Sequence, residues 1–333
     1  WSTEAVLPWA CRTLHGKPVT VSRVICEQDR TVTGSPESRP NLAVPRTVCR
    51  RLLDELRGFD GLGIEMLAAC EYEFTLAKPR EGDWVPFFDG VDIFATLQNN
   101  KAADFLYELE GKMEQAGIDI QTMNAEYGHG QLEVTFAPKF GIEAADAGST
   151  FKTGVKEIAQ AQGLRASFMT RPFTVNQVCN GGHFNFSLWA PSADAPKDEE
   201  ALGGFSTDGR VNALHSTADA SGLSATAKHF LAGVLSHGPA IEAFAAPTPP
   251  CYDRHGKWAP TCASWGVEDR NSAVRVKAHP SGSPRSCYME YRMPSAASNP
   301  YLVIASLVAA GLDGLRNKLE LPPPLQSIDS GAK

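Results

Sequence analysis

The sequence lacks the features that mark several classes of protein. No apolar run approaches the roughly 20 residues needed to cross a bilayer, and no charged-then-apolar signal segment opens the chain. No run of Lys or Arg is present, and the formal net charge is −7, which argues against a nucleic-acid-binding surface. We therefore expect neither a membrane nor a nucleic acid as a partner.

The eight cysteines include no C-x-x-C pair, which disfavours a zinc site or a disulfide framework. Several lie in apolar, strand-like segments, where a buried reduced thiol is the more common arrangement. We therefore expect a reducing, cytoplasmic location. The cysteines are Cys11, Cys26, Cys49, Cys70, Cys179, Cys251, Cys262 and Cys287.

Helical and strand patterns are mixed without a regular βαβ alternation, which predicts the α+β class. Helices are predicted at 46–59, 100–118, 151–163, 222–244 and 299–319, with an interruption at His237–Gly238–Pro239. Strands are predicted at 65–76, 128–138, 165–173, 181–189, 271–278 and 286–293. The first 45 residues are irregular, and the tail 322–333 is expected to be unstructured. A length of 333 residues would suit about two domains.

Two glutamates lie one residue apart in the predicted strand "ACEYEFTL". Side chains two positions apart on a strand share a face, so Glu71 and Glu73 point away from Cys70, Tyr72 and Phe74. For an isolated E-x-E pattern, the common explanation is a strand with one solvated face. The other predicted strands decide whether that explanation is sufficient.

Other segments carry similar polar groups. The alternating residues place Gln131, Glu133 and Thr135 on one face, His183, Asn185 and Ser187 on another, and Glu290 with Arg292 on a third. Glu126 precedes Glu133 across a corner containing Gly128 and Gly130, and Arg270 and Arg275 frame a further strand. A lone histidine such as His183 is more often a satisfied core or surface residue than a ligand. The recurrence of acidic residues on several strands nevertheless favours one shared site.

If these faces line one cavity, five glutamates and one histidine converge there. Carboxylates that crowded cannot all ionise unless cations neutralise them. Oxygen-rich sites favour Mg²⁺ or Mn²⁺, and the backbone spacing of Glu71 and Glu73, roughly 6–7 Å, suits two neighbouring ions. Arginines beside metal ions are typical of phosphoryl transfer. The residues therefore predict a two-metal, nucleotide-using enzyme.

A set of motifs along the chain resembles a known family. The segments "EYEF", "EYGHGQLEV", "GGHFNFSLW", "DRNSAVRV" and "YMEYRMPSAASNPYLVIASLVAAGLDG" are similar, in the same order, to the class I glutamine synthetase catalytic domain. The resemblance covers 46–320, and "VLPWA", "RVICE", "VTGSP" and "FGIEAADAGSTFKTGVKE" are most similar to the lengsin branch of that family. It implies a catalytic fold at 46–333, an antiparallel half-barrel sheet with surrounding helices that stops before the family's C-terminal helices. Residues 1–45 would be a remnant of an N-terminal β-grasp domain.

The resemblance also implies roles for individual residues. Glu73, Glu126 and Glu133 match the ligands of a first Mg²⁺ or Mn²⁺, and Glu71, His183 and Glu290 match those of a second. Arg254 and Arg292 match the arginines that bind glutamate, Arg270 and Arg275 match those that neutralise the transferred phosphate, and Asn185 matches a nucleotide contact. The implied activity is ATP-dependent ligation of glutamate with ammonia through γ-glutamyl phosphate, in a stacked-ring dodecamer. Two alternatives stay open: a lengsin-like structural protein of the eye lens or a related tissue, and a γ-glutamyl ligase for another amine.

Several segments depart from the family pattern. The flap after Arg254 reads "HGKWA" and has no acid, although the family often uses a flap glutamate to deprotonate ammonium. The stretch "VNQVCNGGH" lacks the usual N-G-x-G-x-H spacing, so Asn176 or Asn180 could take the place of the family's asparagine. A latch aspartate is expected on an N-terminal segment that precedes this sequence. Residues 13–24 and 37–44 interrupt matching segments, either as surface loops or through a flawed gene model.

Overall fold

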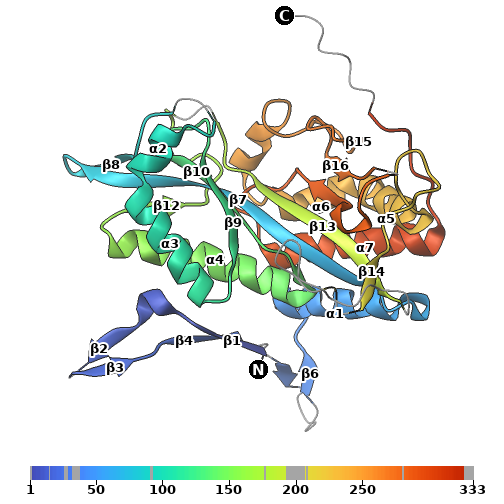
Figure 1. The fold of residues 1–333 in the computed structure, drawn as a ribbon, viewed down its shortest axis with the longest axis horizontal. Helices are drawn as coiled ribbons and strands as arrows, with labels where there is room; N and C mark the ends of the chain where they lie inside the picture. Colours follow the sequence, from blue (N-terminus) through green and yellow to red (C-terminus); the bar gives the residue numbers. More distant parts are fainter. Residues whose placement is uncertain are drawn as a thin grey trace, which may run out of the picture.

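The structure is a computed structural model that describes residues 2–14, 16–25, 29–31, 38–90, 93–175, 178–192, 207, 209–279 and 281–325. Its centre is one large, open sheet with helices packed along it (Figure 1). This mixture of a mainly antiparallel sheet and surrounding helices confirms the α+β prediction.

The central sheet contains eleven described strands. Along its main path lie β15 (Trp265–Val267), β16 (Val274–Lys277), β17 (Tyr288–Tyr291), β13 (Gly182–Pro191), β7 (Glu65–Arg80), β10 (Gln131–Phe136) and β9 (Ile120–Ala125). Four further strands pair with β7 or β13: β8 (Asp83–Pro86), β11 (Lys139–Phe140), β12 (Arg165–Ser167) and β14 (Arg210–Asn212). The β15–β16 pair is parallel, and the other described pairs in this sheet are antiparallel.

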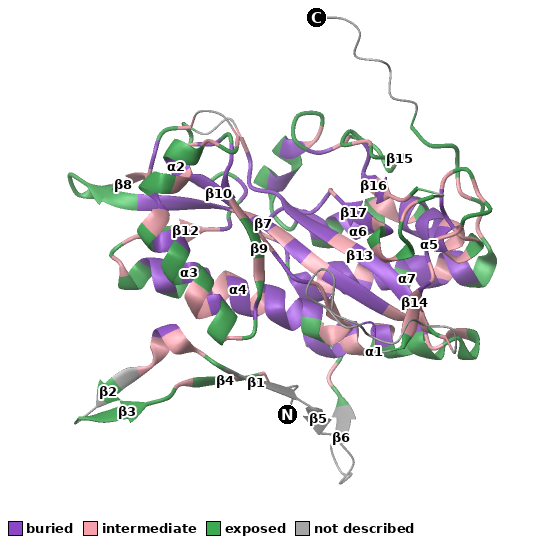
Figure 2. Cartoon of the chain, viewed as in Figure 1, coloured by how far each residue is buried: buried purple, intermediate pink, exposed green. Residues whose placement is uncertain are grey.

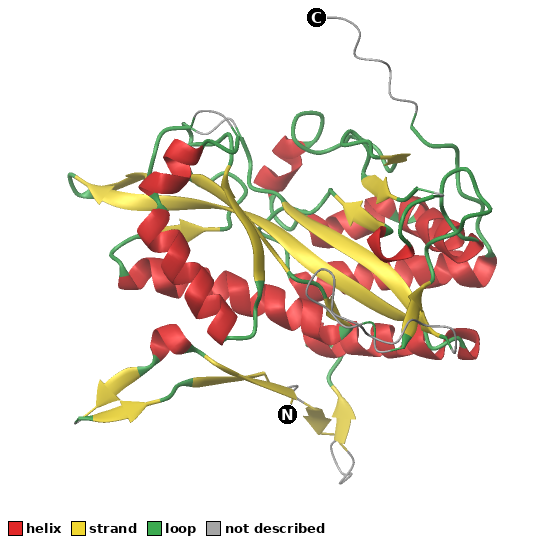
Figure 3. Cartoon of the chain, in the orientation of Figure 1, coloured by secondary structure: helices red, strands yellow, loops and turns green. Residues whose placement is uncertain are grey.

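Figure 3 distinguishes the helices that pack along the sheet. They are α1 (Pro45–Gly58), α2 (Thr96–Lys101), α3 (Ala103–Gln115), α4 (Ile142–Ala161), α5 (Ala225–Ser236), α6 (Gly238–Ala245) and α7 (Pro300–Asn317). The expected interruption near His237 is present between α5 and α6. Two predictions were wrong in extent: α4 begins at Ile142 rather than 151, and the strand predicted at 165–173 ends at Ser167. The helix α2 was not predicted.

The long strand β7 separates an apolar layer from the polar face of the sheet. Tyr72 stacks on Phe151 of α4 with ring centroids 6.2 Å apart, and Phe74 meets Phe105 of α3 edge-on at 6.2 Å. Tyr72 and Phe74 are fully buried, as Figure 2 shows for most of the strand's centre. Because alternate residues point to opposite faces, this packing directs Glu71 and Glu73 away from the helices.

The segments before α1 form short paired strands beside the main body (Figure 1). β1 (Ser2–Val6) pairs with β4 (Ser22–Ile25), β2 (Arg12–Leu14) with β3 (Lys17–Val19), and β5 (Asp29–Thr31) with β6 (Ser38–Pro40). Trp9 anchors this region, since its indole Nε1 donates to Glu157 Oε2 of α4 at 2.5 Å. The side chains of β3 are exposed, and those of β4 alternate between exposed and half-buried. Whether 13–24 is an insertion stays a prediction. The β-grasp origin of 1–45 stays a prediction.

The structure also bears on the expectations about cysteines and membranes. Cys49, Cys70, Cys179, Cys251 and Cys287 are buried thiols without disulfides. Burial raises the pKa of the Cys49 and Cys70 thiols to about 12. Cys26 lies outside the described residues. Among the described helices, none combines the length and the apolar character required to cross a membrane.

The crossing of α5 and α7 depends on glycine. A Cβ added at Gly233 would lie 2.1 Å from the carbonyl oxygen of Ala310 and 2.8 Å from the backbone nitrogen of Gly314. We expect Gly233→Ala to lower the free energy of unfolding by about 1–3 kcal/mol, because the two helix backbones must move apart. Gly111→Ala is the matched control, since nothing lies within 4 Å of that Cβ. It should be neutral or stabilising by up to about 1 kcal/mol through helix propensity. Urea denaturation of both variants measures the difference, and equal stabilities would contradict the close packing of these helices.

Candidate active site

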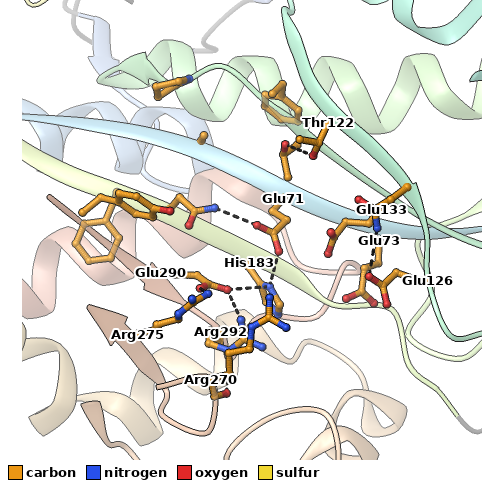
Figure 4. Close-up of a pocket in the computed structure, with 18 of the residues that line it drawn as sticks. Glu71, Glu73, Thr122, Glu126, Glu133, His183, Arg270, Arg275, Glu290 and Arg292 are labelled. Atoms are coloured by element: carbon orange, nitrogen blue, oxygen red, sulfur yellow. Dashed lines mark hydrogen bonds and ion pairs between the residues drawn. The ribbon is translucent and has the colours of Figure 1, made fainter. Parts of the chain in front are cut away.

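Strand register brings the predicted polar faces together. His183 on β13 is the cross-strand partner of Glu71 on β7, and Glu133 on β10 is the partner of Glu73. On the other side of β13, Glu290 is paired with both Asn185 and Arg275. The result is one continuous polar surface across β10, β7, β13, β17 and β16, which Figure 4 shows in close-up.

This surface lines a cavity of about 1080 Å³. Every site residue predicted from the sequence contributes to its wall: Glu71, Glu73, Glu126, Glu133, His183, Asn185, Arg254, Arg270, Arg275, Glu290 and Arg292. Their assigned roles stay predictions, but their convergence in one place is a property of the fold.

Glu71 lies at the centre of the cavity's first acidic group. His183 Nδ1 lies 2.9 Å from Glu71 Oε1 and 3.4 Å from Glu290 Oε1, and Asn185 Nδ2 donates to Glu71 Oε2 at 3.3 Å. Burial alone would raise the pKa of Glu71, but the hydrogen bonds from His183 and Asn185 lower it to about 2. Glu71 therefore carries a negative charge at neutral pH.

Glu73, Glu126 and Glu133 form the second acidic group, which lies nearer to β10 in Figure 4. Glu73 Oε2 accepts hydrogen bonds from Gln131 Nε2 at 2.7 Å and from the backbone N–H of Gly181 at 2.8 Å. Burial, with the charge of Glu73, raises the pKa of Glu126 to about 8. Burial, with the charges of Glu71 and Glu73, raises the pKa of Glu133 to about 10. Without added positive charge, these carboxylates cannot all be ionised together.

The donor atoms suit a divalent cation. The closest ligand atoms of Glu71, Glu133 and His183 all lie within 4.8 Å of one another. Carboxylate oxygens with a single imidazole are a ligand set for a hard or borderline cation such as Mg²⁺ or Mn²⁺. The resemblance assigned Glu133 to a different ion from Glu71 and His183. The structure brings the three together, so the two predicted ligand sets are contiguous.

Three arginines form a cationic wall beside Glu290. Arg275 Nη1 donates to Glu290 Oε2 at 3.2 Å, and Arg292 Nη1 pairs with Glu290 Oε1. Arg292 Nε donates to the carbonyl oxygen of Arg270 at 3.1 Å, while the Arg270 side chain is exposed. Figure 4 shows these side chains on the His183 side of the cavity, opposite Glu73 and Glu126.

Arg254 is the most deeply buried cation of the site, with a relative exposure of 2%. Its Nη1 donates to the carbonyl oxygen of Met293 at 2.6 Å, and burial lowers the pKa of its guanidinium. A Cβ at Gly181 would lie 3.0 Å from Arg254 Nη2 and 3.2 Å from Glu73 Oε1, so a larger residue there would press on both side chains. A guanidinium held this way is suited to bind a carboxylate.

One glutamine, Gln131, and one asparagine, Asn180, make hydrogen bonds that the sequence analysis did not predict. Gln131 was placed only on a polar face, yet its amide bonds Glu73 and also accepts from the backbone N–H of Gly128 at 2.9 Å. Asn180 is buried, donates to Thr75 Oγ1 and to the carbonyl oxygen of Met169, and accepts from Gln131 Nε2. It supports the loop before His183 and is absent from the cavity wall. Asn176 lies outside the described residues.

An open sheet with a cavity of carboxylates, one histidine and arginines on its polar face is the architecture of glutamine synthetase-like proteins. The chain matches the family model described as "Glutamine synthetase, catalytic domain" over residues 42–329. The chain therefore belongs to the glutamine synthetase family, and the expected fold is confirmed.

Individual relatives support the same conclusion. The chain is 34% identical over 326 residues to lengsin of Canis lupus familiaris, covering 95% of this chain and 49% of that protein. It is 34% identical to glutamine synthetase of Mycolicibacterium smegmatis, covering 97% of this chain and 66% of that protein. A solved complex titled "GmaS/ADP complex" is similar with a TM-score of 0.72 and 27% identity, over 86% of this chain and 63% of that chain. The chain spans between 49% and 58% of the length of the lengsin sequences that it matches.

Proposed function

We propose that this protein is an ATP-dependent ligase that phosphorylates the side-chain carboxylate of glutamate and then transfers the γ-glutamyl group to ammonia or to another amine. The observation that carries the proposal is the convergence of the six candidate ligands and the arginines around a single cavity. Membership of the glutamine synthetase family supports it.

Each group of the cavity has a place in this reaction. Arg254 and Arg292 would bind glutamate, and Arg270 and Arg275 would neutralise charge on the phosphoryl group as it leaves ATP. Glu290 holds Arg275 and Arg292 in position, because it bonds both guanidinium groups. Asn185, which is already bonded to Glu71, would contact the nucleotide.

Two Mg²⁺ or Mn²⁺ ions would occupy the acidic part of the cavity. Burial, together with neighbouring negative charge, raises the pKa values of Glu126 and Glu133, and divalent cations would offset that charge. Glu73, Glu126 and Glu133 would hold one ion and Glu71, His183 and Glu290 the other. When bound, such ions supply charge neutralisation to the nucleotide phosphates and to the substrate. The solved ADP complex of a similar fold supports a nucleotide in this family of structures.

The competing candidate is a lengsin-like structural protein without ligase activity, which the identity to lengsins favours. A structural role gives no reason to retain this set of buried ionisable groups, since unpaired buried charge destabilises a fold. We therefore favour the enzyme. We further propose a cytoplasmic, stacked-ring dodecamer, as expected for the family.

Phosphate release from ATP tests the proposal. With Mg²⁺ present, we expect glutamate to stimulate release at least about tenfold, because the arginines and cations act on the phosphoryl group without help from the flap. Adding ammonium should raise the rate of phosphate release by less than about twofold at neutral pH. Ammonium is almost fully protonated there, and the loop "HGKWA" offers no acid to deprotonate it.

Aspartate is the control substrate, since its carboxylate is one methylene too short to reach the same position. No glutamate-dependent release from an assembled protein would support the structural alternative. A steep, saturating response to ammonium would show that another acid replaces the missing flap glutamate.

A further inference from the structure

A lysine on α4 connects the helix layer to the loop between β17 and α7. Lys152 Nζ donates to the carbonyl oxygens of Ala296 and Ser298, at 2.6 and 2.7 Å. The same ammonium group lies 5.3 Å from the ring centroid of Tyr72 and 5.4 Å from that of Phe168. Two charge-assisted hydrogen bonds and two aromatic faces therefore fix this cation beneath the loop. The side chain lies on the helix side of β7 and does not line the cavity.

The loop 293–298 also contacts the segment that leads into β13. Two backbone hydrogen bonds, of 2.9 and 3.1 Å, join the loop to residues 180–182. Within that segment, the N–H of Gly181 donates to Glu73 Oε2 at 2.8 Å. A shift of the loop would therefore move a backbone donor away from one of the carboxylates of the cavity.

The same loop holds Arg254. Arg254 Nη1 donates to the carbonyl oxygen of Met293 at 2.6 Å, and Nη2 donates to that of Arg292 at 3.5 Å. The guanidinium is almost fully buried, so it has little freedom to reorient unless this backbone moves with it. The position of the loop thus sets the position of the group that would bind glutamate.

We propose that Lys152 is a positioning residue for glutamate binding. It acts through the loop 293–298, which orients Arg254 and the backbone donor to Glu73. The inference rests on the proposed ligase function, and it adds to that function a residue of the helix layer that touches neither the substrate nor a cation.

The charge that this role requires is lost at mildly alkaline pH. Burial, with the charge of Lys156, lowers the pKa of Lys152 to about 8. The titratable groups on β7 beside Nζ are Cys70 and Tyr72. Burial raises the pKa of Cys70 to about 12 and that of Tyr72 well above its usual range, so both stay neutral up to about pH 9. Below its pKa, Lys152 is protonated and makes charge-assisted bonds to the loop. Above it, these bonds weaken.

Steady-state kinetics of two variants test the proposal. Lys152→Met keeps the length of the side chain but removes its charge. It should raise the KM for glutamate about tenfold and change kcat and the KM for ATP by less than about threefold, since the lost bonds are charge-assisted. Lys156→Met is the matched control, because Lys156 lies 5.9 Å from the same Phe168 ring but is exposed. It should change each constant by less than about twofold.

Three kinetic results would overturn the inference. The first is an unchanged KM for glutamate in Lys152→Met. The second is an equal loss in kcat and in both KM values, which a general loosening of the fold would cause. The third is an effect of Lys156→Met as large as that of Lys152→Met.

The pH dependence tests the charge itself. In the wild type, the KM for glutamate should rise about fivefold between about pH 7 and about pH 9, as Lys152 loses its proton. Lys152→Arg stays charged over this range, so its KM should stay within about twofold of one value. A rise of the same size in both proteins would mean that another group controls the response, and would contradict the role of Lys152.

Hydrogen exchange separates this inference from the proposed function. If folded wild-type protein shows no glutamate-dependent phosphate release, the ligase proposal fails, but the hold of Lys152 on the loop is still measurable. Corrected for intrinsic rates, amides of 180–182 and 293–298 should exchange about fivefold faster at about pH 9 than at about pH 7 in the wild type, and not in Lys152→Arg. Peptides from α5 should show no such change. Equal protection of the loop at both pH values in the wild type would show that Lys152 does not hold it.

Discussion

Replacing Glu290 with glutamine should reduce glutamate-dependent phosphate release by about 10²–10³-fold, the usual effect of disabling a group that stabilises transition-state charge. Glu290 is 4% exposed and contacts Arg275, Arg292 and His183. Glutamine keeps the shape of the side chain but removes the charge that orients both guanidinium groups and helps to hold a cation. Steady-state kinetics with ATP and glutamate measure the loss, which should appear mainly in kcat.

Glu268 provides a control on the opposite side of the same arginine. Glu268 Oε2 accepts from Arg275 Nη2 at 2.7 Å and pairs with Lys277 at 3.0 Å, but its side chain is 56% exposed. Glu268→Gln should change kcat by less than about threefold, because exposed ion pairs contribute little. Equal losses in Glu290→Gln and Glu268→Gln would mean that only the orientation of Arg275 matters, and would contradict a direct role for the Glu290 charge.

Glu133 distinguishes the two proposed ion sites. Glu133→Gln is expected to raise the KM for glutamate more than it lowers kcat, because the resemblance assigns Glu133 to the ion that orders glutamate. Its donor oxygen also lies within 4.8 Å of the Glu71 and His183 ligand atoms. If Glu133→Gln and Glu290→Gln impair both constants equally, the division into two functionally separate sites is wrong.

The polar faces of the strands could be predicted because their signal is local. Alternation at period two places Glu71 with Glu73 and His183 with Asn185 wherever the strand lies in the sheet. The pairing of Glu133 with Glu73 could not be obtained this way, since strand register depends on contacts distant in sequence. Family resemblance supplied that missing information.

The features that sequence reasoning missed have physical causes. The first half of α4 is rich in Ala and Gly, so it has no strong apolar periodicity, although Ala144, Ala145 and Ala147 are buried there. These small residues let α4 approach β7 closely: a Cβ at Gly148 would lie 3.0 Å from Cys70 Sγ. The contact between the rings of Tyr127 and Trp258, whose centroids are 6.0 Å apart, was also missed. These residues are far apart in the sequence, and no local pattern predicts that they meet.

Removing the carboxylate of Asp146 should cause the largest loss of stability, with the free energy of unfolding falling by about 3–5 kcal/mol in Asp146→Ala. Arg46 donates to this carboxylate through Nε at 2.9 Å and through Nη2 at 2.8 Å, and the hydroxyl of Tyr301 donates at 2.6 Å. Arg46 and Asp146 side chains are only 4% and 5% exposed, so the variant leaves a buried arginine without this partner. Because the three residues belong to α1, α4 and α7, the cluster ties together the helices behind β7.

An exposed ion pair that also involves α1 gives the control. Arg316 of α7 pairs with Glu55 of α1, with side-chain exposures of 50% and 46%. Glu55→Ala should cost less than about 1 kcal/mol, because water solvates the arginine that remains. Urea denaturation compares the two variants, and a cost for Asp146→Ala as small as that for Glu55→Ala would show that Arg46 finds other compensation.

Well below its unfolding transition, Asp146→Ala should retain the catalytic constants of the wild type, since Asp146 lies on the opposite side of β7 from the cavity and does not line it. Loss of activity in the folded variant would instead mean that the helix layer sets the position of Glu71 and Glu73.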